Sequence, residues 1–485
     1  MDHKTIEPKW RKIWKAKGVY KTDLTKAKKK FYNLMMFPYP SAEGMHVGNM
    51  YAFTGADIYG RFQAMRGFNV FEPIGLDGFG IHSENYAIKI NKHPVDQAKV
   101  SQKRFYDQLE RIGNRFSWDH RLETYDPEYY RWTQWLFVQM FKHKLAYRKQ
   151  AQVNWCPSCK TVLADEQVID GQCERCHSPV EKRETEQWFF RITKYADRLL
   201  DNLKKIDWPK KIKIAQEQWI GRSEGVEISW EIALSKNLKG KKITTFTTRP
   251  DTIYGATFLV LAPDHPLVGS LALGKKVLDY VQKAILKTEQ QRKLEEKKKT
   301  GVPTDYSVVH PLTGKLIPIW IADFVLKDYG TGAVMGVPAH DERDMAFAKK
   351  YKLPVIDILK DKEEIIKDLE KRGLAKRTVN YHLRDWLISR QRYWGPPIPM
   401  IYCEACAKLS TSKVESLMPG WYPEENLPVK LPYLKNFKPT SDGQPPLERA
   451  PRDWLEVACP ECGGAARRET EVSDTFLDSS WYFLR

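Results

Sequence analysis

Residues 31–80, FYNLMMFPYPSAEGMHVGNMYAFTGADIYGRFQAMRGFNVFEPIGLDGFG, decide the fold of this chain. An apolar run of strand length occupies 31–37, and the prolines that follow end it. Apolar residues at helical spacing predict a helix over 46–66. A second short strand at 69–73 leads into a glycine-rich loop at 75–80. Strand, loop, helix and strand in this order are typical of the opening of a doubly wound α/β sheet, so we expect a Rossmann-like parallel sheet.

The predicted helix begins with His46-Val-Gly48, directly after the apolar strand. Free backbone N–H groups and the helix dipole at such a position favour anions, which predicts a phosphate site. The imidazole of His46 could bond a developing phosphorane, and Gly48 would let an adenine approach closely. For a histidine after a loop, taken alone, a surface or capping role is the more common interpretation, so the surrounding residues decide.

Those surrounding residues resemble the class I aminoacyl-tRNA synthetases, which carry His-Ile-Gly-His here and bind ATP for attack of the amino acid carboxylate on the α-phosphate. The lead-in Met-Phe-Pro-Tyr-Pro-Ser at 36–41 is similar to the leucine member. The resemblance implies leucine, tRNA and ATP with Mg²⁺ as ligands. The residues that it assigns to ATP are His46, Gly48, Asn49, Gly75, Asp77 and Gly78. The residues that it assigns to the amino-acid pocket are Phe37, Tyr39, Asp77 and Asp478, with Asp77 holding the substrate ammonium.

Two positions depart from the family pattern. Asn49 stands where the family has its second histidine, and an amide can donate a hydrogen bond but cannot become cationic, so we expect weaker transition-state stabilisation there. His82 stands where the family has proline, in Ile81-His-Ser-Glu-Asn85. The resemblance nevertheless continues along the chain, in the segments 219–225, 384–395 and 474–482.

A second pair of motifs lies within 226–375, where short β-branched strands alternate with helices. Thr247-Thr-Arg-Pro-Asp-Thr252 resembles the threonine-rich editing motif of leucyl enzymes, and 330–344 resembles its companion wall. Taken singly, each fits an ordinary strand or turn; together, and in this order, they favour a hydrolytic editing site. One methylene discriminates by only about 1–3 kcal/mol, so a second sieve is needed to reject close analogues of leucine.

The resemblance implies distinct roles within that editing site. Asp344 would grip the mischarged α-amino group, Thr252 would exclude the correct side chain, and the residues before it would position the ester and water. The full set is Thr247, Thr248, Arg249, Asp251, Thr252, His340, Asp341 and Asp344.

The eight cysteines fall into four Cys-x-x-Cys pairs with none left over. In a chain without a secretory signal, this pattern favours metal over disulfides. Cys156, Cys159, Cys173 and Cys176 have the spacing of a structural zinc ribbon, although His177 could replace Cys176. Cys403, Cys406, Cys459 and Cys462 predict a second structural zinc site with a longer spacer; cysteines without metal are the alternative at both.

Composition adds weaker constraints. The net charge of +18 favours encounter with phosphate polymers such as tRNA, although lysine-rich chains are often basic for other reasons. No apolar run approaches the length of a membrane span and no secretory signal opens the chain, so we expect a cytoplasmic protein without membrane contact. The mixed charge run 287–299 predicts a solvated helix or linker.

The family's second signature, Lys-Met-Ser-Lys-Ser, is absent from the sequence, and Ser410-Thr-Ser-Lys413 lies inside a cysteine insert and is rejected as a substitute. We therefore expect the catalytic domain to be incomplete, with the remainder lost by truncation or supplied by a separate C-terminal half, and a monomer if complete. Competing hypotheses are an isoleucyl or valyl enzyme, a tRNA-binding or trans-editing fragment without synthetic activity, and a zinc-ribbon nucleic-acid-binding protein.

The expected architecture is α/β, an incomplete Rossmann-like catalytic domain with inserted zinc ribbons and a separate mixed α/β editing domain. The expected boundaries are 1–153, catalytic domain; 154–180, zinc insert; 181–225, catalytic continuation and linker; 226–375, editing domain; 376–400, catalytic return; 401–467, second zinc insert; and 468–485, catalytic domain.

Overall fold

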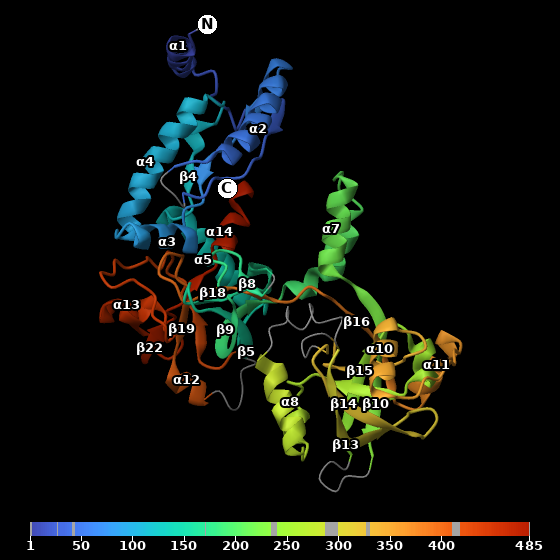
Figure 1. The fold of residues 1–485 in the computed structure, drawn as a ribbon. Coiled ribbons are helices and arrows are strands. Elements are labelled where there is room, and N and C mark those ends of the chain that lie inside the picture. The colour runs from blue at the N-terminus through green and yellow to red at the C-terminus, as the bar shows by residue number, and fades with distance from the viewer. Residues whose placement is uncertain are drawn as a thin grey trace. The chain divides into compact units, whose positions relative to one another are not determined.

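A computed structural model describes residues 2–26, 28–40, 44–169, 171–233, 240–286, 299–325, 330–409 and 418–484. The charge run 287–299, apart from Lys299, and the Ser410–Lys413 segment lie outside the described residues. The chain forms two compact units, Met1–Arg191 with Trp386–Arg485, and Ile192–Asp385 (Figure 1). Throughout the described ranges, every helix is too short or too polar to cross a membrane.

The first unit opens with the predicted strand–helix–strand order. Strand β1 (Lys30–Tyr32) pairs in parallel with β2 (Asn69–Phe71), and helix α2 (Val47–Met65) connects them. Strand β3 (Gly75–Leu76) likewise pairs in parallel with β4 (Leu122–Glu123). The parallel α/β class is therefore confirmed.

The first strand is shorter than the apolar run predicts. The backbone N–H of Asn33 still donates to Phe71 at 2.8 Å, but beyond it the chain leaves the ladder. Residues 33–37 keep the alternating burial of an extended segment, with Asn33, Met35 and Phe37 buried. Side-chain alternation thus continues past the last strand partner, which is why hydropathy alone overestimates the strand.

One further helix of the first unit begins at a residue that is favoured at that position. Asp126 caps α5 (Pro127–Lys142), with its carboxylate accepting from the N–H of Glu128 at 2.9 Å and proline in the first turn. The other helices are α1 (His3–Lys17), α3 (Ile81–Lys89) and α4 (Pro94–Ile112).

Two small β structures carry the cysteines. The long ribbon β5 (Ala146–Cys156) with β9 (Glu181–Phe190) holds the first pairs, and β6 (Thr161–Leu163) and the returning β17 (Trp386–Leu387) complete that sheet.

The second insert is a four-stranded antiparallel sheet in the order β20-β19-β22-β21. Its strands are β19 (Met400–Tyr402), β20 (Trp421–Pro423), β21 (Glu456–Ala458) and β22 (Ala465–Arg468), joined by α12 (Glu404–Leu409) and α13 (Arg452–Leu455). Strands β7 (Val168–Ile169) and β8 (Gln172–Cys173), then β18 (Ser389–Arg390) and β23 (Val472–Ser473), form two further pairs before α14 (Thr475–Ser479).

The second unit is built on a seven-stranded mixed sheet in the order β11-β10-β13-β14-β12-β15, with β16 also paired to β10. Among the strand pairs of its described residues, β12 with β14 is parallel and the others are antiparallel. The strands are β10 (Ser223–Ile232), β11 (Lys242–Thr247), β12 (Phe258–Leu261), β13 (Gly301–Val309), β14 (Leu316–Ala322), β15 (Ala333–Gly336) and β16 (Ala375–Asn380). Helices are α6 (Ala196–Leu203), α7 (Lys210–Ile220), α8 (Lys275–Leu286), α10 (Glu342–Tyr351) and α11 (Lys362–Lys371). A separate mixed α/β domain is confirmed; this compact unit extends beyond 226–375 because it includes α6 and α7.

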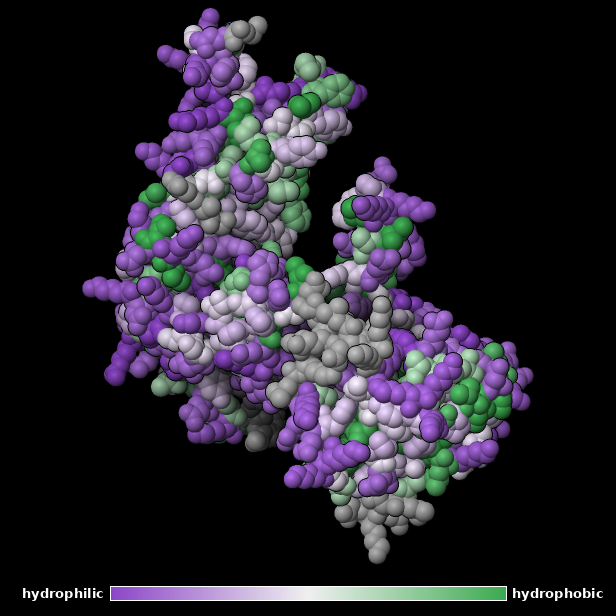
Figure 2. Space-filling model, in the orientation of Figure 1, coloured by the Kyte–Doolittle hydropathy of each residue, from purple (hydrophilic) through white to green (hydrophobic). Residues whose placement is uncertain are grey.

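Helix α2 exposes several large apolar side chains (Figure 2). They include Val47, Tyr51, Ile58 and Met65, all more than half exposed. Phe53 on the same helix is fully buried, against Phe116. The helix therefore packs through one side and leaves another apolar side open.

Candidate active site

The His46 motif lies at the N-terminus of α2, as the sequence predicts. His46 is the N-cap residue, and its backbone N–H donates to the side-chain oxygen of Asn49 at 3.3 Å. Because of this bond, Asn49 has a local structural role that does not depend on cationic charge. Both His46 and Gly48 are exposed, so the helix tip is open to a ligand.

The glycine loop is tightly packed. A Cβ on Gly75 would lie 2.3 Å from the carbonyl oxygen of Leu122, and one on Gly78 would lie 2.2 Å from the ring of Tyr125. Packing alone thus requires glycine at both positions. An ATP contact for Gly75 and Gly78 remains a prediction from the family resemblance.

Asp77 follows β3 and is almost completely buried, at 1% exposure. Its Oδ1 accepts from the hydroxyl of Thr124 at 3.1 Å, while Oδ2 has no hydrogen-bond partner among the described residues. Burial raises the pKa of Asp77 to about 7, although hydroxyls, including those of Tyr39 and Ser479, partly oppose the shift. A cationic donor at Oδ2 would compensate the cost of burying this carboxylate.

Asp478, on α14, is a second buried carboxylate near Asp77. Its Oδ1 accepts from Thr133 at 2.8 Å, and Oδ2 has no partner in the described part of the chain. Burial and then the negative charge of Asp77 raise the pKa of Asp478 well above its usual value. Asp77 and Asp478 are therefore close enough to interact electrostatically, so the structure brings these two predicted pocket residues together.

Aromatic rings surround these carboxylates. Phe37 stacks on Tyr482 with centroids 4.2 Å apart, and Tyr129 stacks on Trp481 at 4.3 Å. The hydroxyl of Tyr129 also donates to the backbone carbonyl of Asp478 at 2.6 Å. Four further residues lie around the predicted pocket without belonging to the set predicted from the sequence: Thr124, Thr133, Tyr129 and Tyr482. Of these, Tyr482 alone lies within a segment that resembles the family, 474–482.

A cavity of about 250 Å³ lies beside Tyr39. Gly80, His82, Arg175 and Thr475 contribute to its lining. His82, the departure from the family pattern, therefore lines the same cavity as Tyr39, one of the residues predicted for the amino-acid pocket.

The two cysteine groups have geometry suited to tetrahedral metal. In each group the four Sγ atoms lie within 4.8 Å of one another, and Cys176 completes the first. Sulfur–sulfur distances of 3.4 Å for Cys156–Cys176 and 3.9 Å for Cys159–Cys173 compare with about 3.8 Å around a zinc ion bonded at about 2.3 Å. Four thiols and no spare position fit a structural zinc ion at each group.

The first cysteine group is joined to the catalytic unit through a buried arginine. Arg392 donates from Nη1 to the carbonyl of Cys159 and pairs through Nη2 with Glu84 at 3.1 Å. Arg392 and Glu84 are both essentially unexposed, and Glu84 lies on α3, directly after the glycine loop. Arg392 thus links the backbone of the ribbon to the helix that follows the glycine loop.

The threonine-rich segment of the second unit forms a tight turn after β11. The hydroxyl of Thr247 accepts from the N–H of Arg249 at 3.0 Å, and the hydroxyl of Thr252 donates to the carbonyl of Arg249 at 2.8 Å. Arg249 pairs with Asp251 at 2.7 Å. Thr252 is buried, whereas Thr248 and Arg249 are exposed. The residues predicted to take part in editing therefore also hold this turn together.

The companion segment lies against this turn. The N–H of Thr257 donates to Gly336 at 3.0 Å, and the ring of His340 lies 3.5 Å from where a Cβ on Gly255 would be. Asp341 caps α10, and Asp344 accepts from the N–H of Val337 at 2.8 Å. Burial raises the pKa of Asp344 to about 6. The two editing motifs are thus brought together in space.

Comparison with known proteins agrees with this arrangement. Residues 9–249 match the family described as tRNA synthetases class I (I, L, M and V), and residues 217–381 match the leucyl-tRNA synthetase editing domain. The chain is 43% identical to the leucine–tRNA ligase of Alkaliphilus oremlandii, over 99% of this chain and 62% of the relative. It is 46% identical to that of Caldanaerobacter subterraneus, over 99% and 60%.

A solved structure gives the same result. The ternary complex of Agrobacterium radiobacter LeuRS, tRNA and LeuAMS superposes with a TM-score of 0.86 at 37% identity, over 100% of this chain and 59% of that chain. With the parallel sheet, the helix-tip histidine and the buried aspartates, these matches define a class I aminoacyl-tRNA synthetase. Within this class, the chain belongs to the leucyl-tRNA synthetase family. It spans about 60% of the length of the relatives that it matches.

Proposed function

We propose that this chain takes part in the ATP-dependent activation of leucine and its transfer to tRNA, and in the hydrolysis of mischarged tRNA. The observation that carries the proposal is the pair of buried aspartates, Asp77 and Asp478, each with an oxygen that lacks a partner in the described structure. Two such carboxylates beside stacked aromatic rings suit a ligand with an ammonium group and an apolar side chain.

In this proposal, Asp77 accepts from the leucine ammonium, and Asp478 offers a second buried carboxyl oxygen nearby. Phe37, Tyr39 and Tyr482 enclose the aliphatic side chain. The open N-terminus of α2, with His46 and Gly48, receives the phosphates of ATP, which brings Mg²⁺ with it. The leucine carboxylate then attacks the α-phosphorus and pyrophosphate leaves, so the residues mainly position the reactants and stabilise developing charge.

The second proposed reaction takes place in the editing domain. Asp344 would bind the free α-amino group of a misacylated tRNA, and the buried Thr252 would limit the size of the side chain that enters. The residues around them, including His340 and Asp251, would position the ester and its attacking water. The burial of Asp344, which raises its pKa, supports a site where a cation compensates the carboxylate.

Zinc at both cysteine groups would be structural, because four sulfur ligands leave no position for water. The leucine acceptor tRNA is the proposed macromolecular partner, consistent with the net charge of +18. A separate C-terminal half, a monomeric state and a cytoplasmic location remain predictions from the sequence.

Two assays test the proposal. Leucine-dependent exchange of pyrophosphate into ATP is measured with the chain alone and with the C-terminal part of a relative added, using Asp77→Asn as the inactive control. Deacylation of mischarged leucine tRNA is measured in parallel, using Asp344→Asn. Exchange that Asp77→Asn abolishes supports activation. Deacylation without exchange in either mixture indicates an editing fragment, and failure of both contradicts the proposal.

A further inference from the structure

A separate cavity of about 420 Å³ lies in the first unit, between the β5–β9 ribbon and the second cysteine insert. Its lining includes Arg148 and Gln187 from the ribbon, Trp421 from β20, and Glu469 and Glu471 from the segment that follows β22. Neither the proposed activation site nor the editing site uses this space.

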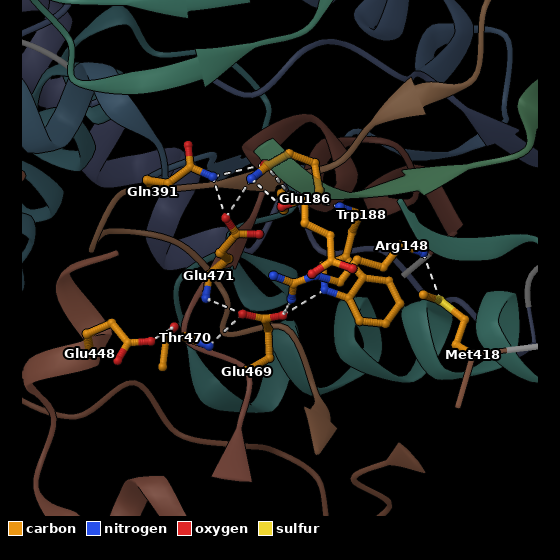
Figure 3. A network of polar contacts seen from close by, with 11 residues as sticks. Arg148, Glu186, Trp188, Gln391, Met418, Glu448, Glu469, Thr470 and Glu471 are labelled. Atoms are coloured by element: carbon orange, nitrogen blue, oxygen red, sulfur yellow. Dashed lines mark hydrogen bonds and ion pairs between the residues drawn. The ribbon is translucent and has the colours of Figure 1, made fainter. Parts of the chain in front are cut away.

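Glu471 is the buried acceptor of the cavity. The residue is 4% exposed, and its Oε1 accepts from the side-chain amides of Gln391 and, at 2.9 Å, Gln187. Its Oε2 is buried without a hydrogen-bond partner among the described residues. Figure 3 shows the same arrangement: the hydrogen bonds from the two glutamine amides reach one carboxyl oxygen of Glu471, and no hydrogen bond reaches the other. A carboxylate held in this way is organised for a donor that the protein does not supply.

The neighbouring arginines are already engaged. Arg148 pairs with Glu469 and, at 3.3 Å, with Glu186, and its guanidinium lies 4.9 Å from the centroid of the Trp421 ring. Arg467 pairs with Glu448 in the same lining. None of these ion pairs includes Glu471.

Charge along the lining is acidic on balance. The acidic lining residues are Glu184, Glu186, Asp442, Glu448, Glu469 and Glu471, and the basic ones are Arg148, Arg183, Arg467 and Arg468. Among the described residues, Glu184, Asp442 and Glu471 have no ion pair with an arginine or lysine. Glu184 and Asp442 are exposed, whereas Glu471 is buried, so negative charge extends from the interior to the rim. Cations are therefore favoured over anions in this cavity.

We propose that the cavity binds a small organic dication of the diamine class, with one primary ammonium on Oε2 of Glu471 and the other at the acidic rim. An ammonium group supplies the missing hydrogen bond to Oε2 and adds a positive charge beside the carboxylate. A bare divalent metal fits less well, because it requires several oxygen ligands and Glu471 offers one free oxygen beside the cationic Arg148. The aromatic surface of Trp421 suits the methylene chain between the two ammonium groups.

Isothermal titration of the full chain with putrescine tests this proposal. We expect saturable binding at one site per chain. Tetramethylammonium, a cation without an N–H donor, should bind at least tenfold more weakly, and n-butylamine, with one ammonium group, should fall between them. Mg²⁺ should not displace putrescine at equal concentration.

Two variants locate the site. Glu471→Gln should weaken putrescine binding at least tenfold, while Glu456→Gln, a matched change at an exposed glutamate outside the cavity, should leave it unchanged. Thr185→Phe, which fills the cavity from the middle of β9 and leaves Glu471 in place, should also weaken binding. Thermal unfolding and zinc content show that each variant is folded.

Three results would overturn the proposal. The first is the absence of saturable binding up to about 10 mM putrescine, a concentration that would still detect a very weak complex. The second is equal affinity for tetramethylammonium and putrescine. The third is unchanged putrescine binding in folded Glu471→Gln. Leucine-dependent exchange is measured on the same preparations. Because exchange depends on Asp77 and putrescine binding on Glu471, either proposal can fail while the other holds.

Discussion

The rings of Phe37 and Tyr482 stack with their centroids 4.2 Å apart and their planes 14° from parallel. Phe37 lies in the lead-in to the first motif, and Tyr482 lies close to the last described residue. Gly75 also approaches Phe37, because a Cβ there would lie 2.7 Å from its ring. One wall of the proposed leucine pocket therefore forms only when the final segment of the chain returns to the first.

The aromatic pair gives a graded prediction. Tyr482→Ala should weaken binding of a non-hydrolysable leucyl-adenylate analogue by about 0.5–1.5 kcal/mol, in addition to the loss of buried ring area. Tyr482→Phe keeps the stacked ring and should bind within about twofold of the parent chain. Titration calorimetry measures both affinities; a weakening as large for Tyr482→Phe as for Tyr482→Ala would show that stacking is not the cause.

The buried Asp77 predicts a pH dependence of binding. Its carboxylate form must be present to accept from an ammonium, and burial raises its pKa to about 7. Binding of the analogue should therefore be strong above pH 7 and weaken towards a tenfold loss per pH unit below it, where protonation competes. Asp77→Asn should remove this dependence and weaken binding at pH 8 by about 2–5 kcal/mol. An affinity that is constant from pH 5.5 to 8.5 would refute this role.

The two cysteine groups should differ in their effect on the active site. Cys159→Ser and Cys406→Ser should each remove about one zinc ion per chain, measured by atomic emission. Cys159→Ser should also weaken binding of the analogue, because Arg392 links the Cys159 carbonyl to Glu84 after the glycine loop. The Arg392 link involves Cys159 and not Cys406, so Cys406→Ser is the matched comparison. Equal effects on binding would argue against specific coupling.

The editing domain offers an independent prediction. Asp344→Asn should slow deacylation of mischarged leucine tRNA at least tenfold, because the amide cannot neutralise the bound α-ammonium group. Asp361→Asn, at the N-cap of α11 in the same domain, provides the matched control and should deacylate at the parental rate. Thermal unfolding distinguishes loss of hydrolysis from loss of folding.

Local signals in the sequence predicted local features well. The helix start at His46 depends on residues a few positions apart, and the grouping of the eight cysteines depends on a strong ligand pattern. The first strand was overestimated because residues 33–37 stay alternately buried after Asn33, where the ladder ends. Burial depends on the layers that cover a segment, whereas strand assignment depends on a hydrogen-bonded neighbour.

Long-range polar contacts were not predictable from the motifs. Thr133 bonds Asp478, and Arg390 pairs with Asp474, across long separations in sequence that no periodicity records. Glu471 belongs to no recognisable motif. Its unpartnered oxygen becomes apparent only in the structure, where Gln187 and Gln391 both donate to the other carboxyl oxygen. The structural reasons for Gly75 and Gly78 likewise come from Leu122 and Tyr125, which pack on them from another part of the fold.

The most direct measurement of the central claim compares two adenylate analogues that differ only in the leucine amine. The chain is titrated with a non-hydrolysable leucyl-adenylate analogue and with its desamino counterpart at pH 8. A buried Asp77 that accepts from the ammonium predicts that the amine strengthens binding by about 2–5 kcal/mol, and that Asp77→Asn removes most of this difference. Equal affinity for the two analogues, in a folded chain, would contradict the account.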